Sequence, residues 1–128
     1  MNVGIIGTGL LGSAIAKRLS LSGHSVLAYN RTRKKAESLK NFGIGIVDSP
    51  KELASKCELV ITVLKDAPII EQMAFGKNGI VHGKHEGLVV ADMSTISPIS
   101  SKNIAKKFAA KGISMIDTPV MGGPSLAE

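Results

Sequence analysis

Two short segments near the amino terminus combine residue types and a spacing that suit the binding of a phosphorylated ligand. The first is a glycine-rich loop after an apolar stretch, with the sequence Gly7-Thr8-Gly9-Leu10-Leu11-Gly12. The first glycine of such a loop permits a tight turn, the second lets the backbone approach a pyrophosphate, and the third lets the next helix pack closely. The first turn of that helix supplies unpaired N–H groups and the positive end of a helix dipole. The loop therefore predicts a dinucleotide site formed by all six residues.

The surroundings of the loop support this prediction. We expect a strand at Asn2–Ile6 before the loop, a helix from Leu10 to Ser22 after it, and a second strand at Ser25–Tyr29. A structural turn without a ligand is the alternative interpretation, since glycine-rich turns are common. The order of strand, loop, helix and strand is the context that the binding motif requires, and it favours the ligand.

The second segment, at the end of the second expected strand, indicates which dinucleotide is bound. Domains that prefer NAD usually carry Asp or Glu here, because a carboxylate accepts hydrogen bonds from the ribose 2′-hydroxyl. This chain has neutral Asn30 followed by Arg31 and Thr32. A guanidinium and a hydroxyl can both bind a 2′-phosphate, which a carboxylate would repel. NADP is therefore the expected cofactor, and NAD is the less favoured one.

More cations follow, and they allow two interpretations. Arg33, Lys34 and Lys35 could form, with Arg31, only a solvated helix start. Positive charge in the first turn of a helix opposes the helix dipole, so a phosphate partner explains these residues better.

Composition limits the classes of function. The chain has 128 residues, 44% of them hydrophobic and 20% charged, which predicts a single soluble globular domain over residues 1–128. The net charge is +6, but the lysines are spread over several expected helices and aromatic residues make up only 3%. We expect no nucleic-acid partner, because stacking surfaces need aromatic side chains. No apolar stretch could span a membrane, and the single Cys57 fits a reducing, cytoplasmic location.

Strands and helices alternate along the whole sequence. Continuous Val, Ile and Leu runs are typical of parallel strands covered on both faces. Helix starts are expected at Ser49-Pro50-Lys51-Glu52, which is a capping box, at Ser97-Pro98 and at Thr32. The pattern predicts an α/β fold with a doubly wound parallel sheet, the Rossmann fold, in the strand order 3-2-1-4-5-6. The expected strands are Asn2–Ile6, Ser25–Tyr29, Ile44–Val47, Leu59–Val63, Leu88–Ala91 and Ile113–Ile116.

Ligands of such a sheet bind outside the carboxyl ends of its strands, where the strand order reverses. Three segments besides the glycine loop lie there: Val63-Leu64-Lys65-Asp66, Asp92 to Pro98 and Asp117 to Pro124. Ser94 and Thr95 offer hydroxyls, and Gly122 and Gly123 offer bare N–H groups to an anion.

The acidic residues and histidines of the chain are weaker candidates for chemistry. Asp92 and Asp117 could cap loops or act in catalysis, and capping is the favoured interpretation because Asp readily bonds nearby backbone. Neither Cys nor paired carboxylates accompany His82 and His85, so we expect no metal site.

Four blocks of the sequence resemble the N-terminal domain of the β-hydroxyacid dehydrogenases, which include 3-hydroxyisobutyrate dehydrogenase, tartronate semialdehyde reductase and 6-phosphogluconate dehydrogenase. The blocks are Gly7 to Gly12, Asn30-Arg31-Thr32, Asp92 to Pro98, and Asp117 to Gly123. The resemblance implies hydride transfer between NADP(H) and a small β-hydroxy acid or semialdehyde.

The resemblance also implies roles for single residues. Cofactor contacts are implied at Thr95 and at the backbone around Val63, Leu64 and Lys65. Gly122 and Gly123 are implied to hold a substrate carboxylate, with Ser94 and Met121 as further substrate contacts. The family usually has Ser in place of Met121, which makes this pocket less polar, and often has Pro in place of Lys65.

In the family, a lysine on a helix beyond the glycine pair acts as general acid/base. No lysine follows Gly123 here, so we assign no catalytic residue and expect that lysine beyond Glu128. The resemblance places it before an all-helical C-terminal domain, missing here, through which the full-length protein would form a homo-oligomer. We therefore expect a fragment or excised domain that binds NADP and catalyses nothing alone. A non-catalytic NADP-binding or interaction module is the main alternative, and an imine or coenzyme-F420-linked NADP reductase is another.

Overall fold

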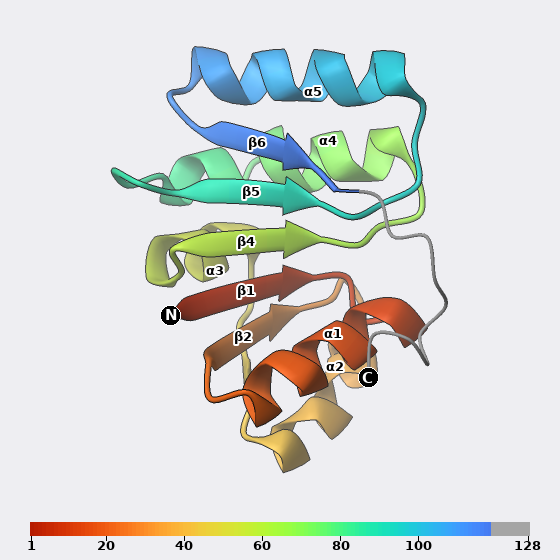
Figure 1. Ribbon diagram of the computed structural model, residues 1–128, viewed down its shortest axis with the longest axis vertical. Helices are drawn as coiled ribbons and strands as arrows, with labels where there is room; N and C mark the ends of the chain where they lie inside the picture. Colours follow the sequence, from red (N-terminus) through yellow and green to blue (C-terminus); the bar gives the residue numbers. More distant parts are fainter. Residues whose placement is uncertain (119–128) are drawn as a thin grey trace.

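A single parallel sheet organises the structure. The computed structural model describes residues 1–118, which form a six-stranded sheet in the order β3-β2-β1-β4-β5-β6 (Figure 1). Every neighbouring pair of strands is parallel. The order reverses beside β1, so the predicted doubly wound Rossmann arrangement is confirmed. The strands are β1 (Asn2–Ile6), β2 (Ser25–Tyr29), β3 (Gly45–Ile46), β4 (Leu59–Thr62), β5 (Val89–Asp92) and β6 (Ser114–Asp117).

Helices connect consecutive strands and lie on both faces of the sheet. In Figure 1, α1 crosses in front of β1 and β2, and α3 and α4 lie behind the sheet. Within residues 1–118, no helix has both the length and the apolar character needed to cross a membrane. The helices are α1 (Leu10–Leu21), α2 (Arg33–Glu37), α3 (Pro50–Lys56), α4 (Ala67–Phe75) and α5 (Pro98–Ala110), with 3-10 helices η1 (Ser38–Phe42) and η2 (Ile80–Gly83).

Alternating side chains of the central strands belong to two apolar layers, one on each face of the sheet. Ile6 belongs to the layer that contains Phe108 of α5, and neighbouring Ile5 belongs to the layer that contains Ala16 of α1 and Leu39 of η1. Successive strand side chains point to opposite faces, so β1 is buried from both sides. This burial fixes the carboxyl end of β1, from which the glycine loop departs.

The predicted helix starts are mostly confirmed. Ser49 Oγ accepts a hydrogen bond from the Glu52 N–H at 3.0 Å, and Ser97 Oγ accepts one from the Ser100 N–H at 3.1 Å. Glu52 Oε1 accepts the return hydrogen bond of the capping box from the Asp48 N–H, whereas the motif predicts the N–H of Ser49, one residue later. Thr32 occupies the cap position of α2, but its side chain makes no capping bond, so that detail of the prediction was wrong.

The strand bounds differ slightly from those predicted. β5 and β6 begin one residue later than expected, because Leu88 and Ile113 are buried in the core without joining the ladder. β4 ends at Thr62, and β3 contains only two residues. Apolar character marks burial rather than pairing, so the sequence pattern overestimates or displaces the paired segment by a residue or two.

Candidate functional site

A cavity of about 290 Å³ opens at the carboxyl ends of the strands beside the strand-order reversal. It brings together eight of the predicted cofactor residues: Gly7, Gly9, Asn30, Arg31, Thr32, Val63, Leu64 and Lys65. It also contains five residues that were not predicted to be part of the site, namely Ile6, Tyr29, Lys35, Ile69 and Met73. The glycine loop and the Asn30-Arg31-Thr32 segment therefore meet in one crevice.

Five predicted cofactor residues lie around this crevice rather than in its lining. Thr8 and Leu10 line a neighbouring groove between α1 and α2, and Gly9 and Lys35 border both hollows. Thr95 is exposed on the loop after β5. Leu11 and Gly12 belong to the first turn of α1.

The three glycines of the loop have three different surroundings. Gly7 has a φ of +103°, and a Cβ placed on it would lie 2.1 Å from the Val63 carbonyl oxygen. A Cβ on Gly12 would lie 1.9 Å from the Gly7 carbonyl oxygen. A Cβ on Gly9 would meet no atom within 4 Å, so packing within residues 1–118 does not require glycine there. An open approach to the backbone at the start of α1 is what a bound pyrophosphate needs.

The side chain of Asn30 joins the glycine loop to the loop after β2. Its Oδ1 accepts a hydrogen bond from the Thr8 N–H, and its Nδ2 donates one to the Thr32 carbonyl, both at 3.0 Å. Ser13 Oγ donates to the Thr8 carbonyl at 3.0 Å, so both backbone groups of Thr8 are held by side chains. The loop is therefore prepared for a ligand before one binds.

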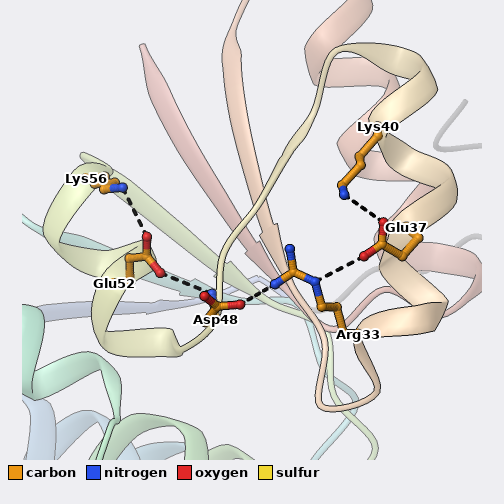
Figure 2. Close-up of polar contacts among 6 residues, drawn as sticks. All are labelled: Arg33, Glu37, Lys40, Asp48, Glu52 and Lys56. Atoms are coloured by element: carbon orange, nitrogen blue, oxygen red, sulfur yellow. Dashed lines mark hydrogen bonds and ion pairs between the residues drawn. The ribbon is translucent and has the colours of Figure 1, made fainter.

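The cations that follow Asn30 separate into two groups. Arg33 bonds the carboxylates of Glu37, with Nε to Oε1 at 3.1 Å, and of Asp48 (Figure 2). Lys40 and Arg33 hold the pKa of the Glu37 carboxyl below its ordinary value. Arg31 and Lys35 line the crevice, and neither forms an ion pair with a carboxylate of residues 1–118. Two positive charges thus remain available to an anionic ligand.

The network around Arg33 extends to α3. Figure 2 shows Arg33 reaching from α2 to Asp48, which lies before α3, where the N–H of Asp48 donates to Glu52 Oε1 at 3.1 Å. That N–H, together with Lys56, lowers the pKa of the Glu52 carboxyl. These contacts tie the start of α2, and with it the Arg31 loop, to the segment that follows the carboxyl end of β3.

Lys35 and the apolar wall of the crevice were not predicted as parts of the site. Lys35 was grouped with the neighbouring cations, although its place in the first turn of α2, three residues after Thr32, already brings it near the loop. Ile69 and Met73 are four residues apart on α4 and therefore share one helix face. That spacing was the available signal for an apolar surface beside the strand ends.

Behind the crevice, buried hydroxyls surround a buried carboxylate. Asp92 Oδ1 accepts hydrogen bonds from Thr62 Oγ1 at 2.8 Å and from the Ser94 N–H at 3.1 Å. The preferred interpretation of Asp92 as a loop cap is confirmed. Ser94, a predicted substrate contact, is 3% exposed, and its Oγ accepts a hydrogen bond from the Leu64 N–H at 2.8 Å.

Some predicted residues lie outside the described part of the chain, and others have ordinary structural partners. Met121, Gly122 and Gly123 fall in residues 119–128, which the structure does not describe. In residues 1–118 no group of three or more His, Cys, Asp or Glu residues could hold a metal ion. His85 Nε2 lies 2.7 Å from the Cys57 carbonyl, and burial raises the pKa of the Cys57 thiol to about 11.

Comparison with known proteins agrees with this geometry. Residues 2–128 match the family described as the NAD binding domain of 6-phosphogluconate dehydrogenase. An uncharacterised oxidoreductase of Bacillus subtilis is 36% identical over 121 residues, which cover 94% of this chain and 42% of that protein. Glyoxylate/succinic semialdehyde reductase 1 of Arabidopsis thaliana is 33% identical over 128 residues, covering 100% and 44%. The structure of Psf3 in complex with NADP+ and 2-OPP has a TM-score of 0.90 at 29% identity, covering 96% and 44%.

The fold and the glycine loop define an NAD(P)-binding Rossmann domain of the oxidoreductase class. The chain belongs to the family of the 6-phosphogluconate dehydrogenase NAD-binding domain, within the β-hydroxyacid dehydrogenase group of oxidoreductases. The predicted resemblance is confirmed. The chain spans 42% of the length of the Bacillus relative and 44% of the length of the Arabidopsis relative.

Proposed function

We propose that residues 1–128 form the NADP(H)-binding domain of an oxidoreductase that transfers a hydride between NADP(H) and a small β-hydroxy acid or semialdehyde. The observation that carries the cofactor choice is the pair of cations in the crevice, Arg31 and Lys35, which form no ion pair within residues 1–118 and lie beside a neutral Asn30. A carboxylate in place of Asn30 would favour the free 2′-hydroxyl of NAD. Psf3, at 29% identity, has been solved with NADP+, which supports the same choice.

The residues present fit this cofactor. The backbone at Gly9 and the first turn of α1 would hold the pyrophosphate, because packing leaves that approach open. Arg31, Thr32 and Lys35 would bind the 2′-phosphate, since a guanidinium and an ammonium attract a dianion. When bound, the nicotinamide supplies the hydride, and Thr95 and the backbone from Val63 to Lys65 are the proposed residues that orient it. Gly122 and Gly123 would hold the substrate carboxylate, and Met121 would be a further, less polar contact with the substrate.

Catalysis is proposed to need residues of the longer protein. The general-acid lysine is proposed to follow Glu128 in a helical domain, which would also supply the homo-oligomer interface. The purified chain is therefore expected to bind NADPH but to show neither oxidation of NADPH with succinic semialdehyde nor reduction of NADP+ with hydroxyisobutyrate, each measured as absorbance at the reduced nicotinamide band. Steady turnover by residues 1–128 would reject the proposed division of labour.

Isothermal titration of the purified chain with NADP+ and with NAD+ tests the cofactor assignment. We expect NADP+ to bind at least roughly tenfold more tightly at low salt, because hydrogen bonds to a charged group contribute about 1.5–3 kcal/mol. Equal affinity for the two dinucleotides would contradict the role of Arg31 and Lys35.

A further inference from the structure

Three buried polar side chains connect the loops that follow β4 and β5. Thr62, Asp92 and Ser94 are 1%, 0% and 3% exposed, and they occupy the carboxyl ends of neighbouring strands. Buried polar groups usually form hydrogen bonds, because an unmade bond in the core is costly. Where these bonds lead shows what the cluster holds in place.

The bonds lead to the wall of the cofactor crevice. Asp92 Oδ1 accepts from Thr62 Oγ1 and from the Ser94 N–H, which orients the Ser94 side chain. Ser94 Oγ then accepts from the Leu64 N–H at 2.8 Å and lies 3.4 Å from the Thr62 carbonyl oxygen. The backbone N–H of Leu64, a residue that lines the crevice, is thus held by a hydroxyl from the next strand.

The same backbone contacts the glycine loop. The Val63 N–H donates to the Ile6 carbonyl at 2.9 Å, and the Val63 carbonyl oxygen lies 2.1 Å from the position that a Cβ of Gly7 would take. A shift of Val63 and Leu64 would therefore change the width of the crevice between this wall and the glycine loop. Because Thr95 directly follows Ser94, the cluster also sets where the loop after β5 begins.

The cluster is not optimised for stability alone. Asp92 Oδ2 is buried and has no hydrogen-bond partner among residues 1–118. A buried carboxylate oxygen without a donor destabilises the folded chain. The other oxygen of Asp92, Oδ1, orients Thr62 and Ser94 through hydrogen bonds.

We propose that Thr62, Asp92 and Ser94 are positioning residues for dinucleotide binding, which act through the backbone of Val63 and Leu64, and that the Ser94 hydroxyl serves this purpose rather than contact with substrate. This inference rests on the proposed dinucleotide function. On this inference, one buried acidic residue and two buried hydroxyls together determine the width of the crevice.

The test compares Ser94→Ala with Ser101→Ala, which removes a hydroxyl of similar burial from α5, away from the crevice. Titration with NADP+ is done at a temperature at which both variants are fully folded. We expect Ser94→Ala to weaken binding roughly three- to tenfold, the loss expected for one hydrogen bond, and Ser101→Ala to leave binding unchanged. Wild-type affinity in Ser94→Ala, or an equal loss in Ser101→Ala, would overturn the proposal.

Conservative variants separate positioning from general destabilisation. Thr62→Val keeps the shape of the side chain without the donor to Asp92, and Thr62→Ser keeps the donor, so only Thr62→Val should weaken binding. Asp92→Asn keeps an acceptor oxygen and should retain affinity that Asp92→Ala loses. Loss in both members of either pair would point to packing instead and would contradict the inference.

A measurement on the free protein separates this inference from the proposed function. Amide hydrogen exchange should speed up at Leu64 in Ser94→Ala while amides inside β4 keep their protection. Unchanged exchange at Leu64 would reject the positioning role whatever the nucleotide result. If the wild-type chain binds neither NADP+ nor NAD+, the proposed function fails, and the exchange at Leu64 still decides whether Ser94 holds this backbone.

Discussion

Asn30 and Thr8 are 22 residues apart in sequence, yet the side-chain Oδ1 of Asn30 accepts a hydrogen bond from the backbone N–H of Thr8 at 3.0 Å. The residue at the position that distinguishes NAD from NADP therefore also shapes the glycine loop. Its amide group, unlike a carboxylate, can at the same time donate to the Thr32 carbonyl. Under the proposed function, cofactor choice and loop geometry would thus be coupled through one side chain.

Asn30→Asp should reverse the cofactor preference. The carboxylate can still accept from Thr8 but cannot donate to Thr32, and it would repel a 2′-phosphate while accepting bonds from a 2′-hydroxyl. We expect NADP+ affinity to fall by at least roughly tenfold and NAD+ affinity to rise or stay constant. Titration with both dinucleotides measures the ratio, and an unchanged preference for NADP+ would show that Asn30 does not contribute to selection.

Arg31→Ala and Arg33→Ala should have unequal effects, although the two arginines are separated by one residue. Loss of Arg31 is expected to weaken NADP+ binding by about ten- to a hundredfold. Loss of Arg33 removes only exposed ion pairs to Glu37 and Asp48, each contributing about 0–1 kcal/mol to folding. Titration and thermal unfolding of both variants check this contrast, and a larger loss of affinity in Arg33→Ala would refute the assignment of the crevice cations.

Gly9→Ala and Gly12→Ala should separate binding from stability. The added methyl at position 12 would meet the Gly7 carbonyl oxygen, so Gly12→Ala should destabilise the fold by roughly 1–3 kcal/mol or more. The methyl at position 9 meets no atom within 4 Å, so Gly9→Ala should unfold close to the wild-type temperature but bind NADP+ weakly. Full cofactor affinity in Gly9→Ala would mean that no phosphate approaches this backbone.

Stability should depend on pH through His85. The Cys57 carbonyl lies 2.7 Å from Nε2 and the Glu86 carbonyl 3.0 Å from Nδ1, so the doubly protonated ring satisfies both and its pKa is raised. A raised pKa in the folded state contributes stability that is fully present below the ordinary value of about 6.5 and is lost as the pH rises through the folded value.

Urea unfolding of the wild-type chain and of His85→Gln between pH 5 and pH 9 measures this contribution. The stability difference between them should be larger at the acid end of the range and shrink above the ordinary histidine pKa. A difference that stays constant or grows with pH would contradict the two-carbonyl geometry of His85.

The parts of this molecule that were predictable from the sequence depend on local rules. The positive φ of Gly7 and the close packing of Gly12 follow from the spacing of the loop, and the strand order follows from the alternation of strands and helices. The caps at Ser49 and Ser97 need only residues up to three positions away. For the caps and for Gly12 the deciding contact lies within, or next to, one element.

The less predictable parts depend on partners far away in the sequence. Arg33 bonds Asp48, 15 residues later, and does not line the crevice, whereas Arg31 and Lys35 do. Ser94 was predicted to be a substrate contact, and sequence reasoning did not show that its hydroxyl accepts a hydrogen bond from the Leu64 N–H, 30 residues earlier. Residue type and spacing show that a hydroxyl or a cation is present, and only the packed structure shows which way each one is used.

The state of Cys57 makes the chain convenient for site-directed spectroscopy. Cys57 is the only cysteine in the sequence, and it is 1% exposed with a thiol pKa of about 11. At neutral pH roughly one thiol in ten thousand would be ionised, so maleimide or spin-label reagents should leave it largely unmodified. A cysteine introduced at an exposed position such as Gln72, next to Met73 of the crevice, could then carry a single fluorophore in the otherwise native protein, and would report nucleotide arrival at the crevice in real time.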